Sequence, residues 1–196
     1  ASGQRGIAVQ ADITKEDDVI RLFETCTQEL GPVTGVVNSA GIVEPYGRVD
    51  EISYADLAPL IDINVTAMIM VTGEAIKNMS SKHGGAGGAI VLVSSVSARL
   101  GGPAFCAPYA ASKGAVDSFA WGVAQEVVGE GIRVNAVSPG LIDTEIQPEG
   151  RVEAAGPNLP MGRVGQPDEV ARAIVFLLSD DASYIAGSNL DVAAGR

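Results

Sequence analysis

The sequence contains few of the residues that bind metals or form disulfides. His83 is the single histidine, and Cys26 and Cys106 are far apart, with no Cys-x-x-Cys pair and no histidine at ligand spacing. We therefore expect neither a metal centre nor a disulfide framework. Basic residues are also scarce, with 13 Lys and Arg against 24 Asp and Glu, which gives a net charge of -11. Because nucleic-acid binders need clustered Lys and Arg, no DNA or RNA partner is expected.

A long uninterrupted hydrophobic run is missing as well. The most apolar stretch, residues 57–71, contains Asp62 and Asn64, which makes it too short and too polar to span a bilayer. No signal peptide precedes it, so we expect no membrane partner and a cytoplasmic location. With 196 residues, 46% of them hydrophobic, the chain is long enough for one sizeable core, and a single domain over 1–196 is expected.

The hydrophobic pattern alternates between the period of strands and that of helices. Helices are expected over 14–30, 53–79, 109–128 and 167–178, and strands over 7–9, 33–37, 89–94, 133–137 and 190–192. The first helix would begin with Thr14 and Asp17 in a capping box and would bury Cys26 on its apolar face. This alternation indicates an α/β fold, a doubly wound parallel sheet in three layers that resembles the Rossmann fold.

Polar and glycine-rich residues follow several of the predicted strands. They are Asn38-Ser39-Ala40-Gly41, Ser94-Ser95 and the segment 139–144. In a parallel sheet the ligand binds beyond the carboxyl ends of the strands, so these segments are expected to converge on one rim.

Tyr109 and Lys113 open the third predicted helix, just after a predicted strand. A phenol and an ammonium four residues apart share a helical face, so the cation would lower the pKa of the phenol and make it a usable acid/base. Such a pair also occurs by chance on many helix surfaces.

Taken in order, these segments resemble the short-chain dehydrogenase/reductase family. The local sequence is most similar to that of its sugar-dehydrogenase-like and 3-oxoacyl-reductase-like members. The matching residues are Asp12, Asn38, Ala40, Gly41, Asn64, Ser95, Tyr109, Lys113, Asn135, Pro139, Gly140, Ile142 and Thr144. The resemblance implies an NAD(P)-dependent oxidoreductase that interconverts a small alcohol and its carbonyl compound by hydride transfer.

The resemblance also implies catalytic roles. Tyr109 would exchange a proton with the substrate oxygen, Lys113 would tune Tyr109 and hold the nicotinamide ribose, and Ser95 would donate a hydrogen bond to the substrate oxygen. Ser94 and Ser97 lie close to Ser95, but Ser95 matches the family pattern. Asn64 would anchor a water that links Lys113 to solvent. Alternatively, Asn64 only distorts its helix and is satisfied by the backbone.

On the cofactor side the resemblance implies contacts with NAD or NADP. Asp12 would lie near the adenine, the turn of Asn38, Ala40 and Gly41 near the adenosine ribose, and Pro139, Gly140, Ile142 and Thr144 near the nicotinamide half. Simpler readings remain open: Asp12 could precede a helix cap, and Pro139-Gly140 could be only a turn. The sequence does not indicate which of the two cofactors is used.

The family's first strand, its Gly-rich pyrophosphate-binding turn and the following helix have no counterpart here. About 50 residues, one and a half βαβ units, would be missing, so we expect the sequence to be part of a longer protein. Without the family's first two strands, the predicted strand 7–9 would have no neighbouring strand. Residues 33–37 would then form an exposed edge of the sheet that is prone to aggregation. This gap leaves open an alternative function, a non-catalytic fragment or relative that acts as an assembly or binding module.

Gly114, Ser118 and Gly122 form a stripe of small residues along the third helix. Each mid-helix glycine costs about 1 kcal/mol relative to alanine, which close approach of another backbone would offset. In the family the helices that contain Asn64 and Tyr109 pack against a second subunit, so the resemblance implies a homodimer or homotetramer. The alternative is tight packing within one subunit.

Overall fold

The computed structural model describes residues 5–147 and 150–196 of the chain. Within them the strands form one parallel sheet in the order β1-β2-β3-β4. The strands are β1 Gly35–Asn38, β2 Gly88–Val93, β3 Ile132–Pro139 and β4 Asn189–Val192. The central pairs are in register, with Val36 opposite Ile90 and Ile90 opposite Val134.

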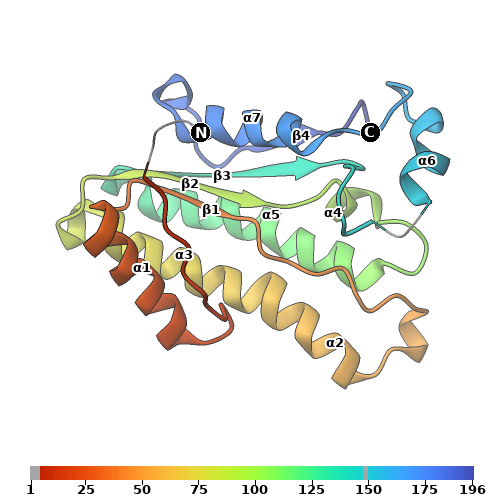
Figure 1. Ribbon diagram of the computed structural model, residues 1–196, viewed down its shortest axis with the longest axis horizontal. Coiled ribbons are helices and arrows are strands. Elements are labelled where there is room, and N and C mark those ends of the chain that lie inside the picture. The colour runs from red at the N-terminus through yellow and green to blue at the C-terminus, as the bar shows by residue number, and fades with distance from the viewer. Residues whose placement is uncertain (1–4, 148–149) are drawn as a thin grey trace.

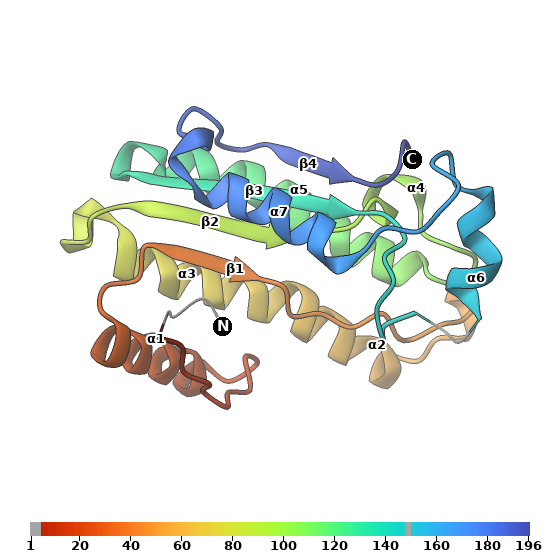
Figure 2. The same ribbon diagram turned by 45° about the horizontal axis from the view of Figure 1, so that its top comes forward.

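Helices cover both faces of this sheet, and Figures 1 and 2 show α1, α3 and α5 on one face and α7 on the other. The α-helices are α1 Glu16–Leu30, α2 Tyr54–Ile61, α3 Met68–Met79, α4 Ser97–Leu100, α5 Ala107–Val127, α6 Arg151–Ala155 and α7 Pro167–Leu178. One hydrophobic cluster lies on each side, so the predicted three-layer α/β fold is confirmed.

The second predicted helix is continuous from Tyr54 to Met79 and contains a π-helical segment, η2 Asp62–Ala67. The Ser53 hydroxyl accepts a hydrogen bond from Asp56 N, as the predicted cap requires. At 26 residues the helix is long and apolar enough, by length and composition, to cross a membrane. The prediction that this segment is too short to span a bilayer considered only residues 57–71, and it is wrong for the whole helix. Its buried face, which includes Leu60, Met68 and Met79, nevertheless packs as that of a core helix does.

The start of α1 differs from the prediction. Lys15 is the N-cap residue and makes no side-chain cap. The Thr14 hydroxyl donates to Asp12 Oδ1 at 2.7 Å and lies in the turn before the helix, one residue ahead of the N-cap position. Cys26 is only half-buried, because Val19 and Phe23 form the buried part of the helix.

Residues 7–9 do not form the predicted strand. In the described part of the chain no strand lies beside them, and an extended segment without a neighbour has no ladder to join. β1 is correspondingly at the edge of the sheet, and Val37 is 42% exposed. The expectation of an exposed apolar edge is confirmed.

Asn135 and Arg133 hold the last strand and helix against β3. The fully buried Asn135 donates from Nδ2 to the Ile185 carbonyl and accepts from Ser188 N, at 2.8 and 2.9 Å. Arg133 donates to the carbonyls of Leu177 and Ser179 at the end of α7. These bonds satisfy main-chain groups of the segment that leads into β4, so Asn135 has a structural role.

Candidate active site

The carboxyl ends of β1, β2 and β3 point toward the same end of the molecule, where α4 and α6 also lie (Figures 1 and 2). Two cavities open there. The first, here called the α4 cavity, has a volume of about 400 Å³ and lies between α4, the start of α5, the residues 140–141 and 146–147, and Arg151. The second, the α7 cavity, has a volume of about 430 Å³ and lies between the strand ends and α7.

Ser95 and Tyr109 line both cavities. Tyr109 lies in the first turn of α5, and Ser95 follows the end of β2. A hydroxyl pair shared by two adjoining cavities can contact two ligands at once. The predicted convergence of Ser95, Tyr109 and Lys113 is therefore observed.

Lys113 is one turn further along α5 and is only 6% exposed. Its Nζ donates to the Val93 carbonyl at 2.8 Å and lies 5.9 Å from the centroid of the Tyr109 ring. The ammonium is thus held between the end of β2 and the phenol, on the floor of the α7 cavity.

The protonation equilibria differ from the sequence-based expectation. Burial raises the pKa of Tyr109, and the neighbouring Ser95 hydroxyl acts in the opposite direction. The pKa of Tyr109 is therefore raised, and not lowered as predicted from its spacing to Lys113. Burial lowers the pKa of Lys113 itself from 10.5 to about 8, while the carboxylate of Asp117, one helical turn away, opposes this change.

The structure distinguishes the three neighbouring serines. The buried Ser94 hydroxyl donates to the Lys113 main-chain carbonyl at 3.2 Å and so ties β2 to α5. Ser95 Oγ accepts from Ser97 N at 3.1 Å, and the same hydroxyl interacts with Tyr109, where it opposes the rise in pKa caused by burial. Of the three, only Ser95 lines both cavities.

Asn64 lies in the π-helical segment and is 1% exposed. Its Oδ1 accepts from Ile42 N at 2.8 Å, and its Nδ2 donates to the Ile42 carbonyl and to Ser112 Oγ. These bonds match the alternative reading, a helix-distorting Asn that is satisfied mainly by backbone. Asn64 and Lys113 also lie near each other, on either side of Gly41. A Cβ atom added to Gly41 would lie 3.2 Å from Asn64 Oδ1 and 3.4 Å from Lys113 Nζ.

Most of the residues predicted to contact a cofactor surround the α7 cavity. Gly41, Pro139, Gly140, Ile142 and Thr144 line it. Asn38 is buried beside it at the end of β1, and among the described residues its Nδ2 has no hydrogen-bond partner. A buried amide without a partner is costly unless a ligand satisfies it, so this side of the site fits a polar ligand.

Two predicted cofactor residues are not part of these cavities. Ala40 is exposed and lines neither of them. Asp12 lies in a separate shallow depression beside α1, where it accepts hydrogen bonds from Thr14 and pairs with Lys15 at 3.2 Å. These contacts lower the pKa of Asp12 and correspond to the simpler reading, a carboxylate that precedes a helix.

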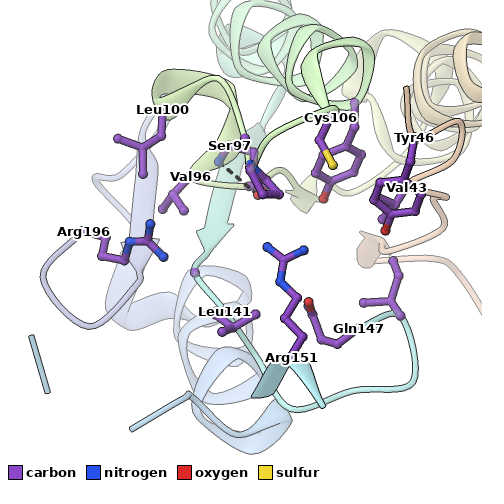
Figure 3. A pocket seen from close by; sticks show the side chains of 16 residues that line it. Val43, Tyr46, Val96, Ser97, Leu100, Cys106, Leu141, Gln147, Arg151 and Arg196 are labelled. Atoms are coloured by element: carbon purple, nitrogen blue, oxygen red, sulfur yellow. Dashed lines mark hydrogen bonds between the residues drawn. The ribbon is translucent and has the colours of Figure 1, made fainter. Parts of the chain in front are cut away.

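Several cavity residues were not found from the sequence. Tyr46, Gln147 and Arg151 line the α4 cavity, and Figure 3 shows the Arg151 side chain directed into it. They lie in loops and in the short helix α6, whose positions depend on the folded chain rather than on a local pattern. Cys106 is both buried and part of the lining.

A parallel sheet covered on both faces, with paired cavities at its strand ends and a Ser, Tyr and Lys between them, defines a Rossmann-like α/β enzyme. A family model described as enoyl-(acyl carrier protein) reductase matches residues 1–196. The chain belongs to the short-chain dehydrogenase/reductase family.

Named relatives agree with this assignment. The chain is 44% identical to the uncharacterized oxidoreductase YgfF of Escherichia coli K12, covering 100% of this chain and 81% of that protein. It is 36% identical to cis-4-hydroxycyclohexanecarboxylate dehydrogenase of Sinomonas cyclohexanicum, covering 99% and 78%. It is 33% identical to 2-(S)-hydroxypropyl-CoM dehydrogenase 3 of Xanthobacter autotrophicus, covering 94% and 74%. The protein is thus an oxidoreductase that acts on an alcohol or carbonyl group of a small molecule.

Proposed function

We propose that the protein interconverts a small alcohol and its carbonyl compound with NAD or NADP, and that Tyr109 is the acid/base. The observation that carries this proposal is the position of Tyr109 and Ser95 in the wall shared by the two cavities. A cofactor in the α7 cavity and a substrate in the α4 cavity would then meet at these two hydroxyls.

In this proposal Ser95 donates a hydrogen bond to the substrate oxygen and fixes its position. Tyr109 gives a proton to a carbonyl oxygen in reduction and removes one from a hydroxyl in oxidation. Because the pKa of Tyr109 is raised, the phenol is protonated at neutral pH and ready for reduction. The nicotinamide, when bound, supplies or accepts the hydride.

Lys113, with a pKa of about 8, is mostly protonated at neutral pH. Its charge favours the phenolate that remains after Tyr109 has given up a proton, and it can donate to a ribose hydroxyl of a cofactor in the α7 cavity. Asn64 hydrogen-bonds to the backbone of Ile42 and so holds the segment beside Lys113 in place. A water bound at Asn64 would complete a proton path from Lys113 to solvent.

The residues present fit the nicotinamide half of a cofactor. The α7 cavity combines apolar walls with glycines at Gly41 and Gly140 and the buried amide of Asn38 beside it. Residues 1–196 include no Gly-rich turn for the pyrophosphate, and the residue that would discriminate NAD from NADP belongs after the family's second strand. Two relatives are named as dehydrogenases of hydroxylated small molecules, which supports an alcohol substrate.

The proposal can be tested on the whole encoded protein. Titration with NADH and NADPH, followed by nicotinamide fluorescence, should show binding of at least one of them. Tyr109→Phe should lower kcat at least about 100-fold with small ketones while leaving cofactor affinity unchanged, because only the proton is lost. Tyr184→Phe, at a fully exposed position, is the matched control and should behave as wild type. Failure to bind either cofactor would refute the proposal.

We also propose a homodimer or homotetramer formed through the outer face of α5. Ser118 is exposed on this face, and Trp121 is 60% exposed. Apart from the adjacent residues and the backbone of α5 itself, no described atom lies within 4 Å of a Cβ built on Gly114 or Gly122. Packing within the subunit therefore does not account for these glycines, whereas the family resemblance implies a second subunit there.

A further inference from the structure

The α4 cavity has an unusual charge for this protein. Much of its wall is apolar and includes Val43, Val96, Leu100 and Leu141. Among the described residues that line it, the charged ones are Arg151 and Arg196, and no carboxylate is present. A chain with a net charge of -11 thus places only positive side chains around this cavity.

Arg151 is the more deeply placed of the two. It is half-buried at the start of α6, and Figure 3 shows its guanidinium extending into the cavity beside Gln147, toward the wall that carries Ser97 and Cys106. Burial raises the pKa values of Cys106 and Tyr46, and the positive charge of Arg151 opposes this rise in both, which agrees with a position close to both.

Most other arginines of the chain already have partners. Those paired with carboxylates are Arg5, Arg21, Arg48, Arg99 and Arg163. Within residues 5–147 and 150–196, Arg151 has no carboxylate in ion-pair range. A guanidinium among apolar walls gains most from an anion that accepts two parallel hydrogen bonds, and a carboxylate has that geometry.

We infer that the substrate carries a carboxylate at the end remote from the reacting carbon, and that Arg151 binds this carboxylate. Arg196, at the rim of the cavity, adds a second positive charge. The inference rests on the proposed function, because it assumes that the reacting oxygen faces Ser95 and Tyr109 in the same cavity. A volume of about 400 Å³ suits a small oxo or hydroxy acid.

Binding can be measured without turnover. The probes are 4-oxopentanoate, 5-oxohexanoate and 6-oxoheptanoate, each compared with its neutral methyl ester, and the readout is ligand-observed NMR on the whole protein. At least one acid should bind about 10- to 100-fold more tightly than its ester, as expected for a charge-assisted pair. Equal affinities for every acid and its ester, or no binding of any acid, would overturn the inference.

Substitutions assign the effect to one side chain. Arg151→Gln should remove the preference for the acid and leave affinity for the ester within about 3-fold, and Arg151→Lys should restore part of it. Arg172→Gln, an exposed arginine on α7, is the matched control and should retain the full preference. A preference that persists in Arg151→Gln would contradict the role of Arg151.

Turnover assays separate the two proposals. Reduction of the esters as efficiently as the acids would contradict the anionic substrate but leave the oxidoreductase proposal intact. A retained binding preference for the acid, with no oxidation of NADH or NADPH by any probe, would contradict the proposed reaction and leave the anion site standing.

Discussion

Lys113 keeps an ammonium group in a part of the molecule that water hardly reaches. With 6% of its surface exposed, it donates one hydrogen bond to the Val93 carbonyl and is attracted by the carboxylate of Asp117. Burial lowers its pKa from 10.5 to about 8, a change that corresponds to about 3 kcal/mol of unfavourable free energy when the group is charged. The folded protein bears this cost at neutral pH.

Replacing this ammonium with an apolar side chain should therefore stabilise the protein. Lys113→Met should raise the free energy of unfolding at pH 7 by about 1 to 2 kcal/mol, less than the full cost because a hydrogen bond is lost, while it abolishes activity. Urea unfolding measures the effect. Lys77→Met, at an exposed position, should show little change.

The same substitution has a defined pH dependence. Between pH 8 and 10.5 the folded protein has released the Lys113 proton and the unfolded chain has not, so wild-type stability rises with pH in this window. The advantage of Lys113→Met should consequently shrink from pH 7 to pH 10. An advantage that stays constant, or a variant less stable than wild type at pH 7, would contradict the assigned burial cost.

At the scale of elements, the turn that leads into β2 is packed against the end of α3 and the turn before β3. Gly87 has a φ of 83°, and its N donates to the Met79 carbonyl at 2.8 Å. A Cβ at Gly87 would overlap the Gly131 carbonyl, whereas a Cβ at Gly84, with a φ of 88°, would meet open space. The two glycines share a left-handed backbone and differ in packing.

Alanine substitutions at these glycines should separate the cost of the left-handed backbone from the cost of steric overlap. Gly84→Ala should destabilise the protein by about 1 to 2 kcal/mol, from the backbone alone. Gly87→Ala should cost about 3 kcal/mol or more, because an overlap with main chain is added. Thermal and urea unfolding of the two variants measure this difference. Similar losses for both would show that the contact with Gly131 does not constrain the turn.

Elements with a strong local signal could be predicted from the sequence. The cap at Ser53 and the apolar run of β2 depend on neighbouring residues, and both are observed. The prediction of a strand at residues 7–9 was wrong. A strand forms only beside a partner strand, and a pattern of three residues does not indicate whether a partner is present. The capping box at Thr14 was wrong because the N-cap position falls one residue later, on Lys15, whose side chain makes no cap.

The candidate site divides in the same way. Tyr109, Ser95 and Gly140 were predictable because parallel strands deliver their carboxyl ends to one rim. Arg151 and Tyr46 were not, since they reach the cavity from the short helix α6 and from a loop, whose positions depend on tertiary packing. The raised pKa of Tyr109 was missed because spacing on a helix indicates proximity and not burial.

At the scale of the whole molecule, the proposed assembly depends on an outward face of small side chains. Ser118→Arg places a long charged group on this face of α5 and should convert the oligomer into single chains, since a buried unpaired charge is costly in an interface. Light scattering after gel filtration at micromolar concentration measures the mass. Gln28→Arg, exposed on α1, should leave the assembly unchanged. A wild-type protein that already runs as a single chain would refute the assembly.

The π-helical segment η2 interrupts the α-helical hydrogen bonding of the helix Tyr54–Met79 and contains Asn64. Deleting one residue within it would let the backbone return to ordinary α-helical hydrogen bonding, so the helix would lose nothing locally. Everything on one side of the deletion would, however, turn by about 100° relative to the other. Asn64 would leave Ile42 and Ser112, or Ser53 would lose its place at the start of the helix. The number of residues in η2 is therefore as constrained as their identity. A homologue with a one-residue deletion in η2 would have a different arrangement of side chains around Lys113.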